Sequence, residues 1–294
     1  MLKQIKFTTY KQAFLAIFCM LVVGSIGFAQ SIPYSNGRIV ISSDGNEHDH
    51  DDWAATPLSL ALLAAKNLQE NLTVYTFSDH IWGSNHDKSD GAKQMRISAL
   101  KGKKIYKFKS TKFIEAVKKP EEAVQAISQQ INISHKGNPL TIIAAGPMEV
   151  VGRAINASNP EALKFVRIIS HSNWNNQHSD KPYNWEEHSG WTWNKIRTKF
   201  EPYGLICDRI LDQNGGKDYE GLKAAKEKYD WIKTSTLNKK SKQHKKQLNW
   251  LYQRQLTCVK KGEFDPSDAG MIVYLLTGKQ KTAPTDVRNI IENQ

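Results

Sequence analysis

The chain has 294 residues, a formal net charge of +12 and 39% hydrophobic residues. This length is enough for one α/β domain with a full core, and no Pro/Ser-rich linker or internal repeat indicates a second domain. The positive charge favours acidic partners and is as compatible with anionic polysaccharides as with nucleic acid.

Residues 1–29 have the layout of a secretory signal peptide. Three lysines precede an apolar stretch from Ala13 to Val23, and the small residue Ala29 ends the segment. The apolar stretch is too short for a membrane-spanning helix, and no stop-transfer pattern follows it. We therefore expect an exported protein, periplasmic or secreted and without a membrane anchor, whose mature chain forms one domain over residues 30–294.

The segment 38–52, RIVISSDGNEHDHDD, joins a predicted strand to a predicted helix. Its β-branched residues 39–41 indicate a buried strand, and residues 53–65 indicate the helix that follows. Between the two lie four aspartates: Asp44, Asp49, Asp51 and Asp52. Carboxylates gathered at the carboxyl end of a strand repel one another unless a cation lies among them, and Ca²⁺ prefers such oxygen ligands. Capping of the helix by one or two of these acids is the alternative explanation.

The rest of the chain alternates between predicted strands and helices. Strands are predicted over residues 72–77, 140–144 and 165–169, and helices over residues 89–100, 120–131 and 149–155. This alternation predicts an α/β fold of the Rossmann type, with an open, mostly parallel sheet and helices on both faces. Polar clusters follow four of the strands, which predicts a site at one edge of the sheet. The lysines between positions 239 and 246 are more typical of a solvated helix face than of a binding patch.

Four motifs, in this order, resemble the nucleoside hydrolase superfamily and its exported, polysaccharide-associated relatives. They are SSDGNEHDHDDW, HIWGSN with Asn85, AAGPMEVVGRAI, and DPSDAGMIVYLLTG with Asp268. Together they span about the whole mature chain. The resemblance implies a nucleoside hydrolase-like α/β domain that cleaves a glycosidic bond.

The resemblance also implies roles for individual residues. It implies a Ca²⁺ shell formed by Asp44, Asp52, Asp268 and the backbone carbonyl of Glu149. Asp44 would be the general base toward a metal-bound water, while Asp51 and Asn85 would contact sugar hydroxyls. One Ca²⁺ ion takes enough oxygen ligands to orient a water and two hydroxyls together.

The chain also departs from the superfamily's pattern. Asp51 follows Asp44 by seven residues, where the usual loop has four. The middle turn has Met-Glu-Val at positions 148–150 in place of Leu-Thr-Asn, and Ser267 stands where a histidine often assists the leaving base. These departures weaken the case for a nucleoside substrate and leave a glycoside-cleaving site intact.

The segment 173–193 is rich in aromatic residues and has neither a clean helical nor a clean strand period. As a long loop over the sheet edge, it would bind a saccharide through the following residues: Asn173, Trp174, Trp185 and Glu186. A secondary core beneath the loop is the alternative, and it explains Trp191 and Trp193 almost as well.

Glycoside hydrolysis also needs a proton donor for the leaving oxygen. Four residues lie on loops predicted at the correct edge: His171, His188, Glu186 and Glu187. Histidine suits a general acid near neutral pH, but each of the four also fits a structural role.

The combined expectation is an exported hydrolase that cleaves a glycosidic bond of an oligosaccharide or polysaccharide, an anionic one included, with Ca²⁺-held water activated by Asp44. The alternatives are a nucleoside hydrolase for extracellular nucleosides, a non-catalytic carbohydrate-binding protein, and a lyase. His48 and His50 leave zinc as a minority alternative to Ca²⁺. We expect a carbohydrate or nucleoside as partner and no nucleic-acid polymer. Homo-oligomer formation and a disulfide between Cys207 and Cys258 both stay open.

Overall fold

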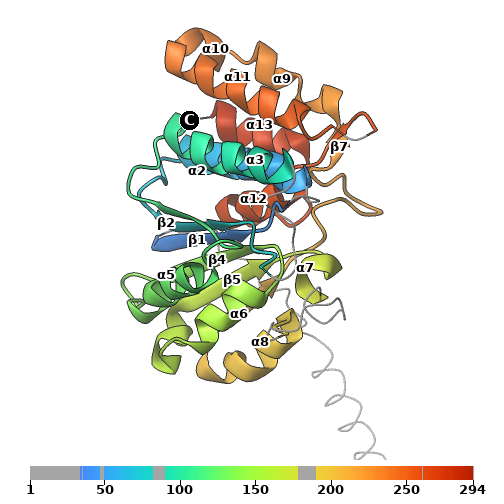
Figure 1. Cartoon of the computed structure of the whole chain (residues 1–294). Coiled ribbons are helices and arrows are strands. Elements are labelled where there is room, and N and C mark those ends of the chain that lie inside the picture. Colours follow the sequence, from blue (N-terminus) through green and yellow to red (C-terminus); the bar gives the residue numbers. More distant parts are fainter. Residues whose placement is uncertain are drawn as a thin grey trace, which may run out of the picture. The chain divides into compact units, whose positions relative to one another are not determined.

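The computed structural model describes residues 34, 36–46, 50–81, 90–177, 190–259 and 261–293. Its centre is a six-stranded sheet in the order β3-β2-β1-β4-β5-β6, in which every neighbouring pair is parallel (Figure 1). The strands are β1 (Arg38–Ser43), β2 (Leu72–Phe77), β3 (Lys112–Glu115), β4 (Leu140–Ala145), β5 (Val166–Ser170) and β6 (Ile206–Arg209). The predicted α/β fold with an open parallel sheet is confirmed.

Alternating side chains of the central strands enter two separate cores. In β1, Ile39 and Ile41 belong to one core and Val40 to the other, as the two-residue period of a strand requires. In β4, Ile143 joins the first core and Ile142 the second. Both faces of the sheet are buried, and this is why these strands are continuous apolar runs instead of alternating apolar and polar residues.

Helices cover both faces of the sheet (Figure 1). The first core lies beneath α2 (His50–Ala65), α3 (Asp90–Arg96), α4 (Gly102–Ile105), α9 (Trp231–Thr234), α10 (Leu237–Lys240), α11 (Lys242–Leu256), α12 (Gly270–Thr277) and α13 (Pro284–Glu292). The second core lies beneath α5 (Pro120–Asn132), α6 (Glu149–Asn156) and α8 (Trp193–Phe200). α2 contacts α11, α12 and α13 and is buried along most of its length, so it has no polar face.

Shorter elements complete the described chain. They are the helix α7 (Asn173–Gln177), a π-helical turn η2 (Ile97–Lys101), the 3₁₀ turns η3 (Pro160–Phe165), η5 (Glu201–Tyr203), η6 (Lys226–Tyr229) and η7 (Ser267–Ala269), and an antiparallel pair of β7 (Ala224–Ala225) and β8 (Glu263–Phe264). No helix within the described residues has the length and apolar content to cross a membrane. Cys207 and Cys258 are both free thiols.

The central sheet has two strands that the sequence pattern did not predict. β3 and β6 have four residues each and lie at the two edges of the sheet, where partial exposure mixes polar with apolar residues. The helix expected over 89–100 instead continues through α3, η2 and α4 to Ile105. The strand order reverses direction between β1 and β4, and this is where open α/β sheets form a crevice at the strands' carboxyl ends.

Candidate functional site

Carboxylates from three parts of the chain converge at the carboxyl end of β1. Asp44 follows β1 directly, Asp51 and Asp52 form the first turn of α2, and Asp268 lies in η7. One carboxylate oxygen from each of Asp51, Asp52 and Asp268 can be chosen so that all lie within 4.8 Å of one another. The Asp44 carboxylate lies within hydrogen-bonding reach of Asp52. The fold therefore brings together four acids, one of them more than 200 residues away in sequence from the other three.

Short local contacts hold Asp44 and Asp52 in place. The Ser43 hydroxyl donates to Asp52 Oδ1 at 2.8 Å, and the Asp44 backbone N–H donates to the Ala145 carbonyl of β4 at 2.9 Å. Gly146 lies against Asp44 so closely that an added Cβ would be 2.8 Å from the Asp44 Cβ. The Gly-Pro turn after β4 therefore makes room for the acidic loop after β1.

The electrostatic environment of Asp52 opposes its ionisation. Its side chain is 2% exposed, and burial raises its pKa well above the usual range, with the nearby charges of Asp44, Asp268 and Asp51 adding to the increase. No Lys or Arg among the described residues forms an ion pair with Asp52. A cation between these acids would remove the repulsion, so the oxygen-only group fits a hard metal ion.

His171, directly after β5, links Asp268 to the exit of β6. Its Nε2 lies against Asp268 Oδ1 in a short contact, and Asn175 Nδ2 approaches the same oxygen at 3.4 Å. On the other side of the ring, the Gln213 backbone N–H donates to Nδ1 at 3.2 Å, and an Asp212 oxygen lies 3.5 Å from Nδ1. Both nitrogens of the ring are engaged, and this fixes the orientation of Asp268.

Burial and charge act in opposite directions on the pKa of His171. Burial lowers the pKa, but the carboxylates of Asp268 and Asp212 outweigh burial and raise it to about 9. The Gln213 contact requires an unprotonated Nδ1, whereas a protonated ring would donate from Nδ1 to Asp212. In either state Nε2 can hold a proton directed at Asp268.

The acids open into a cavity of about 370 Å³. Its wall includes five aspartates: Asp44, Asp51, Asp52, Asp212 and Asp268. The exit of β5, residues 171–175, supplies another side, and Asn214 and Ser267 complete the lining. Trp174 lines this wall and is 37% exposed, and its ring meets the ring of His80 edge-on. The cavity combines carboxylates, amides and an aromatic surface.

A further buried acid, Asp79, lies just after β2. Its Oδ2 accepts hydrogen bonds from Ser42 and, at 2.8 Å, from Thr76, while its Oδ1 has no partner among the described residues. Burial raises the pKa of Asp79 to about 7, against the lowering effect of these two hydroxyls. Nearby, the side chain of Asn46 exchanges two hydrogen bonds with the backbone of His80, which ties the exits of β1 and β2 together.

The structure brings most of the described candidate residues together. The cavity is lined by Asp44, Asp51, Asp52, His171, Asn173, Trp174 and Asp268. Asp51, expected to contact a sugar, lies in the group that could hold a metal. Asn173 Oδ1 also accepts a short hydrogen bond from Arg209. The remaining predictions, Asn85, Trp185, Glu186, Glu187 and His188, fall outside the described residues.

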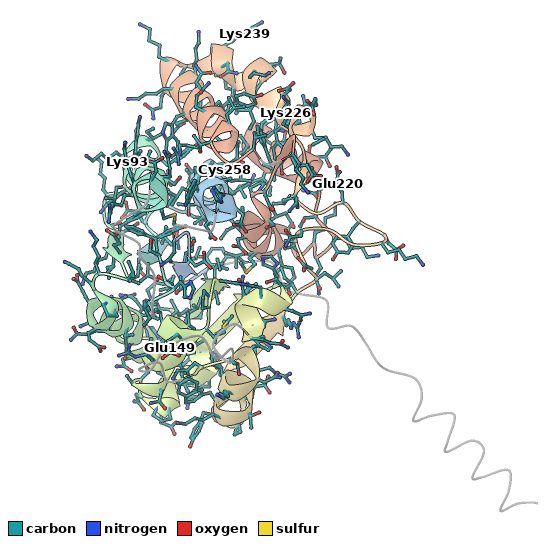
Figure 2. The ribbon with its side chains drawn as sticks, turned by 45° about the vertical axis from the view of Figure 1, so that its right-hand side comes forward. Lys93, Glu149, Glu220, Lys226, Lys239 and Cys258 are labelled. Carbon is teal, nitrogen blue, oxygen red and sulfur yellow. The ribbon has the colours of Figure 1, made fainter. Side chains whose placement is uncertain are left out.

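Glu149 is not one of the three acids whose oxygen atoms could share a metal ion. It begins α6, is 1% exposed, and its Oε2 accepts a hydrogen bond from the Trp191 backbone N–H at 3.0 Å. Its side chain thus anchors the end of the aromatic segment (Figure 2 labels Glu149). The metal contact expected of its backbone carbonyl stays a prediction.

The aromatic segment is not a single long loop. Residues 173–177 form α7, and α8 begins at Trp193. Trp193 is 2% exposed in the second core, and the ring of Trp191 stacks on Phe200 with centroids 5.7 Å apart. Trp193 is thus a core residue and Trp191 packs, partly buried, against the same core, as the alternative explanation expected.

The predicted site residues did not include the part of the cavity wall that follows β6. Asp212 and Asn214 follow β6, a strand that the pattern did not predict. The run from 206 to 216, ICDRILDQNGG, has the strand-then-polar-turn order that marked the other exits, but it is short and interrupted by charges. Recognising it as a strand would have placed Asp212 at the same edge.

Comparison with known proteins adds one relative of unknown activity. The chain is 29% identical over 272 residues to the uncharacterized protein P22 of Formosa agariphila, a match that covers 87% of this chain and 91% of that protein. No protein-family model and no solved structure matches the chain. The function therefore has to be argued from the residues of the site.

Proposed function

We propose that this protein is an exported, nucleoside hydrolase-like enzyme that cleaves a glycosidic bond of a saccharide at a Ca²⁺ site formed by Asp51, Asp52 and Asp268. The observation that carries the proposal is the environment of Asp52, a buried carboxylate surrounded by other carboxylates at the carboxyl end of a parallel sheet. Such a group costs folding free energy unless it is compensated by a cation.

The donor set favours Ca²⁺ over zinc. The three acids that could share an ion offer oxygen atoms, with no His or Cys among the described residues in the group. Ca²⁺ takes six to eight oxygen ligands in flexible geometry, whereas zinc prefers nitrogen and sulfur. Bound there, Ca²⁺ would act as a Lewis acid that activates water and orients sugar hydroxyls.

Each nearby residue has a role that follows from its contacts. Asp44, beside Asp52 at the cavity wall, is the proposed general base. Asp268 Oδ1 is occupied by His171 and Asn175, and this leaves Oδ2 available to a cation. Because both nitrogens of His171 are engaged, its contacts favour positioning of Asp268 over donation to a leaving group. Glu187 and His188 stay the proposed general acids.

The cavity suits a sugar ring. Trp174 offers an exposed aromatic surface, and Asn175 and Asn214 offer amide groups around it. Saccharide sites combine such apolar walls with a few placed polar groups. A volume of about 370 Å³ accommodates one or two sugar units of a longer chain.

The test measures product release by the purified mature protein from anionic oligosaccharides and from ribonucleosides, each with and without a calcium chelator. Sugar release that the chelator abolishes supports the proposal, while release of free base would identify a nucleoside hydrolase instead. Asp44→Asn is expected to lower turnover by about 10³-fold with little loss of saccharide binding. Turnover that is absent from both panels, with saccharide binding unchanged by Asp44→Asn, would indicate a binding protein and overturn the proposal.

A further inference from the structure

Two lysine-rich segments lie far apart in the sequence. Residues 101–109 include Lys101, Lys103, Lys104, Lys107 and Lys109, and residues 239–246 include Lys239, Lys240, Lys242, Lys245 and Lys246. No Asp or Glu occurs between Asp90 and Glu115, the stretch that contains the first segment. None occurs between Asp230 and Glu263, the stretch that contains the second. Neither segment can neutralise its charge with acids of its own neighbourhood in the chain.

The fold packs the two segments against each other. The side-chain amides of Gln243 and Gln247, one turn apart on α11, both donate to the Ile105 carbonyl, at 3.1 and 3.2 Å. The hydroxyl of Tyr106 donates to the Gln247 carbonyl at 3.3 Å, and its ring meets Trp250 edge-on. These contacts join the end of α4 to the start of α11, so the two lysine-rich segments are neighbours in the fold.

The charges on this surface are left uncompensated. Lys103 is used internally, since its ammonium donates to the Thr111 carbonyl at 2.8 Å. The other nine lysines of the two segments are exposed, and none forms an ion pair with a carboxylate of the described chain. We call these nine residues the lysine face: Lys101, Lys104, Lys107, Lys109, Lys239, Lys240, Lys242, Lys245 and Lys246. Figure 2 labels Lys239, one member of the lysine face.

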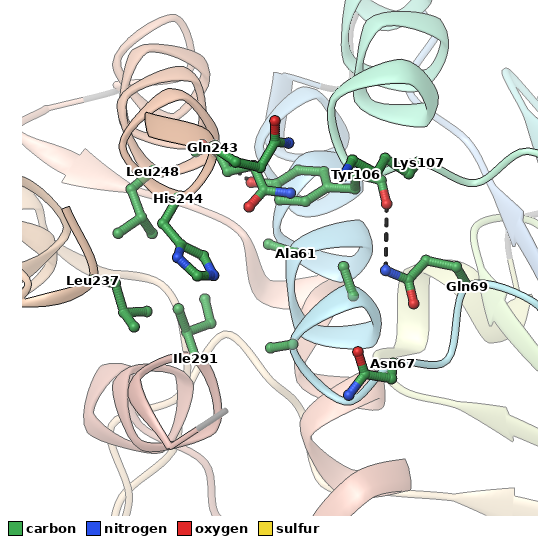
Figure 3. Close-up of a pocket in the computed structure, with 13 residues that line it drawn as sticks. Ala61, Asn67, Gln69, Tyr106, Lys107, Leu237, Gln243, His244, Leu248 and Ile291 are labelled. Atoms are coloured by element: carbon green, nitrogen blue, oxygen red, sulfur yellow. Dashed lines mark hydrogen bonds between the residues drawn. The ribbon is translucent and has the colours of Figure 1, made fainter. Parts of the chain in front are cut away.

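A cavity of about 190 Å³ lies between the two segments (Figure 3). Lys107 contributes to one side and His244 to the other, and the His244 ring points into the space between Leu237, Ile291 and Ala61. Asn67 and Gln69 at the end of α2 add amide groups to the wall. Lys107 is the one lysine of the lysine face that lines this cavity, which we call the hollow, so the other eight lysines lie on the surface around the two segments.

We propose that the lysine face binds a chain of an anionic polysaccharide, such as a sulfated or carboxylated glycan. Nine exposed lysines on two segments that pack against each other complement a polymer that carries repeated negative charges. This surface is separate from the acidic cavity. Asp51 and Asp52 lie in the first turn of α2, and the last turn of the same helix lines the hollow. The length of α2 therefore separates the cavity from the hollow by about 20 Å. The proposal holds whether or not the acidic cavity is catalytic.

Features of the lysine face favour a glycan over nucleic acid or a membrane. The large apolar residues of the two segments, Ile105, Tyr106 and Phe108, are all buried. Stacking on unpaired bases needs exposed aromatic rings, and insertion into a bilayer needs an exposed apolar stripe. The segments contain no arginine, the residue that most often reads base edges.

The physical consequence for the enzyme is retention of a charged substrate. The acidic cavity repels a polyanion, while the lysine face about 20 Å away attracts one. Simultaneous contact of one long chain with both surfaces would raise the local concentration of glycosidic bonds at the cavity.

The test measures binding of fluorescent dextran sulfate to the full mature protein by anisotropy, with uncharged dextran, a short DNA duplex and phosphatidylserine vesicles as comparisons. Binding of dextran sulfate is expected to weaken by roughly 100-fold between about 50 and 200 mM NaCl. The triple variant Lys107→Gln/Lys242→Gln/Lys245→Gln, which removes charge from both segments, is expected to bind about tenfold more weakly.

The matched control removes three exposed lysines elsewhere, in Lys136→Gln/Lys217→Gln/Lys281→Gln, and should change affinity less than about twofold. Equal losses of affinity in the two variants would show an effect of net charge alone and would overturn the proposal. Tighter binding of DNA or of vesicles than of dextran sulfate would also overturn it. Binding should persist with chelator and in Asp268→Asn. Absence of turnover by the natural protein with Ca²⁺ present, while dextran sulfate binding is intact, would therefore count against the proposed function alone.

Discussion

At the scale of single residues, Asp52 is where folding and the proposed function conflict. Its carboxylate is buried beside Asp44 and Asp268, an arrangement that raises its pKa and destabilises the folded state at neutral pH. Proteins tolerate such groups where a ligand compensates for them. The same residue should therefore be unfavourable for stability without metal and necessary for metal binding.

Asp52→Asn is expected to raise the melting temperature in chelator by about 3 °C, since removing one of the clustered charges is worth roughly 1 kcal/mol. It should also weaken Ca²⁺ binding by about 100-fold. Calorimetric titration and thermal melting measure both effects. Glu161→Gln, which removes an exposed acid of the opposite layer, is the control and should change neither. A lower melting temperature together with unchanged Ca²⁺ affinity would contradict this account.

Asp79 predicts a pH dependence of stability. Its pKa is about 7 in the folded protein and near 3.8 when exposed, so folding favours its protonated form. The contribution to stability is full below pH 3.8 and is lost as the pH rises through 7. Asp79→Asn removes this loss, so the free energy of unfolding of the variant relative to the natural protein should increase by about 3 kcal/mol from pH 5 to pH 8. Urea titrations at both pH values measure this difference, and a constant difference would show that Asp79 is ionised throughout.

At the scale of elements, the site depends on how closely the strand exits approach one another. The exits of β1 and β4 meet at Asp44 and Gly146, and the exits of β5 and β6 meet through His171 and Gln213. The carboxyl ends of parallel strands lie at the same edge of the sheet, so loops that are far apart in the sequence become neighbours there. Small changes in one loop should therefore act on acids carried by another.

Gly146→Ala tests this coupling. The new methyl group would lie 2.8 Å from the Asp44 Cβ and 2.9 Å from its backbone nitrogen, so the Asp44 loop must move. We expect turnover to fall by about 100-fold while the protein stays folded by circular dichroism. Gly137→Ala is the control, because its added Cβ would meet His135 at an ordinary 3.4 Å. Equal activity of the two variants would remove Asp44 from the catalytic role.

At the scale of the whole molecule, charge is unevenly distributed. The chain has a net charge of +12, yet the acidic cavity gathers five aspartates and the lysine face gathers nine lysines. Helix α2 extends from the one toward the other, since its first turn contributes Asp51 and Asp52 to the cavity and its last residues lie beside the hollow between the lysine-rich segments. The molecule therefore has an acidic and a basic surface, the sites that we propose for a small cation and for a large anion.

Ca²⁺ should stabilise the whole fold, because its proposed ligands come from α2 and from η7 near the C-terminus. At a Ca²⁺ concentration about 100 times the dissociation constant, the stabilisation is about 2.7 kcal/mol. For a chain of this size the melting temperature should rise by roughly 5 to 10 °C, and less with Mg²⁺, which demands stricter geometry. Thermal melts in chelator, Ca²⁺ and Mg²⁺ measure the effect, and identical melts would argue against a cation site.

Local pattern in the sequence was enough for the fold class and for part of the site. Strands such as 72–77 and 140–144 were predictable because a strand buried on both faces is a continuous apolar run. The acids after residue 43 could be placed at a strand exit for the same reason. The edge strands β3 and β6 could not be predicted, because four partly exposed residues give too weak a hydrophobic pattern.

The sequence by itself thus determined which residues form the central strands and which acids follow them, because these depend on the polarity of neighbours along the chain. Only the tertiary structure decided that Asp51 joins Asp52 and Asp268 and that His171 lies between Asp268 and Asp212. It also decided that two lysine-rich segments more than 100 residues apart form one face. Strand order and helix packing set these neighbours, and both depend on burial of apolar surface between distant segments, which no local pattern encodes.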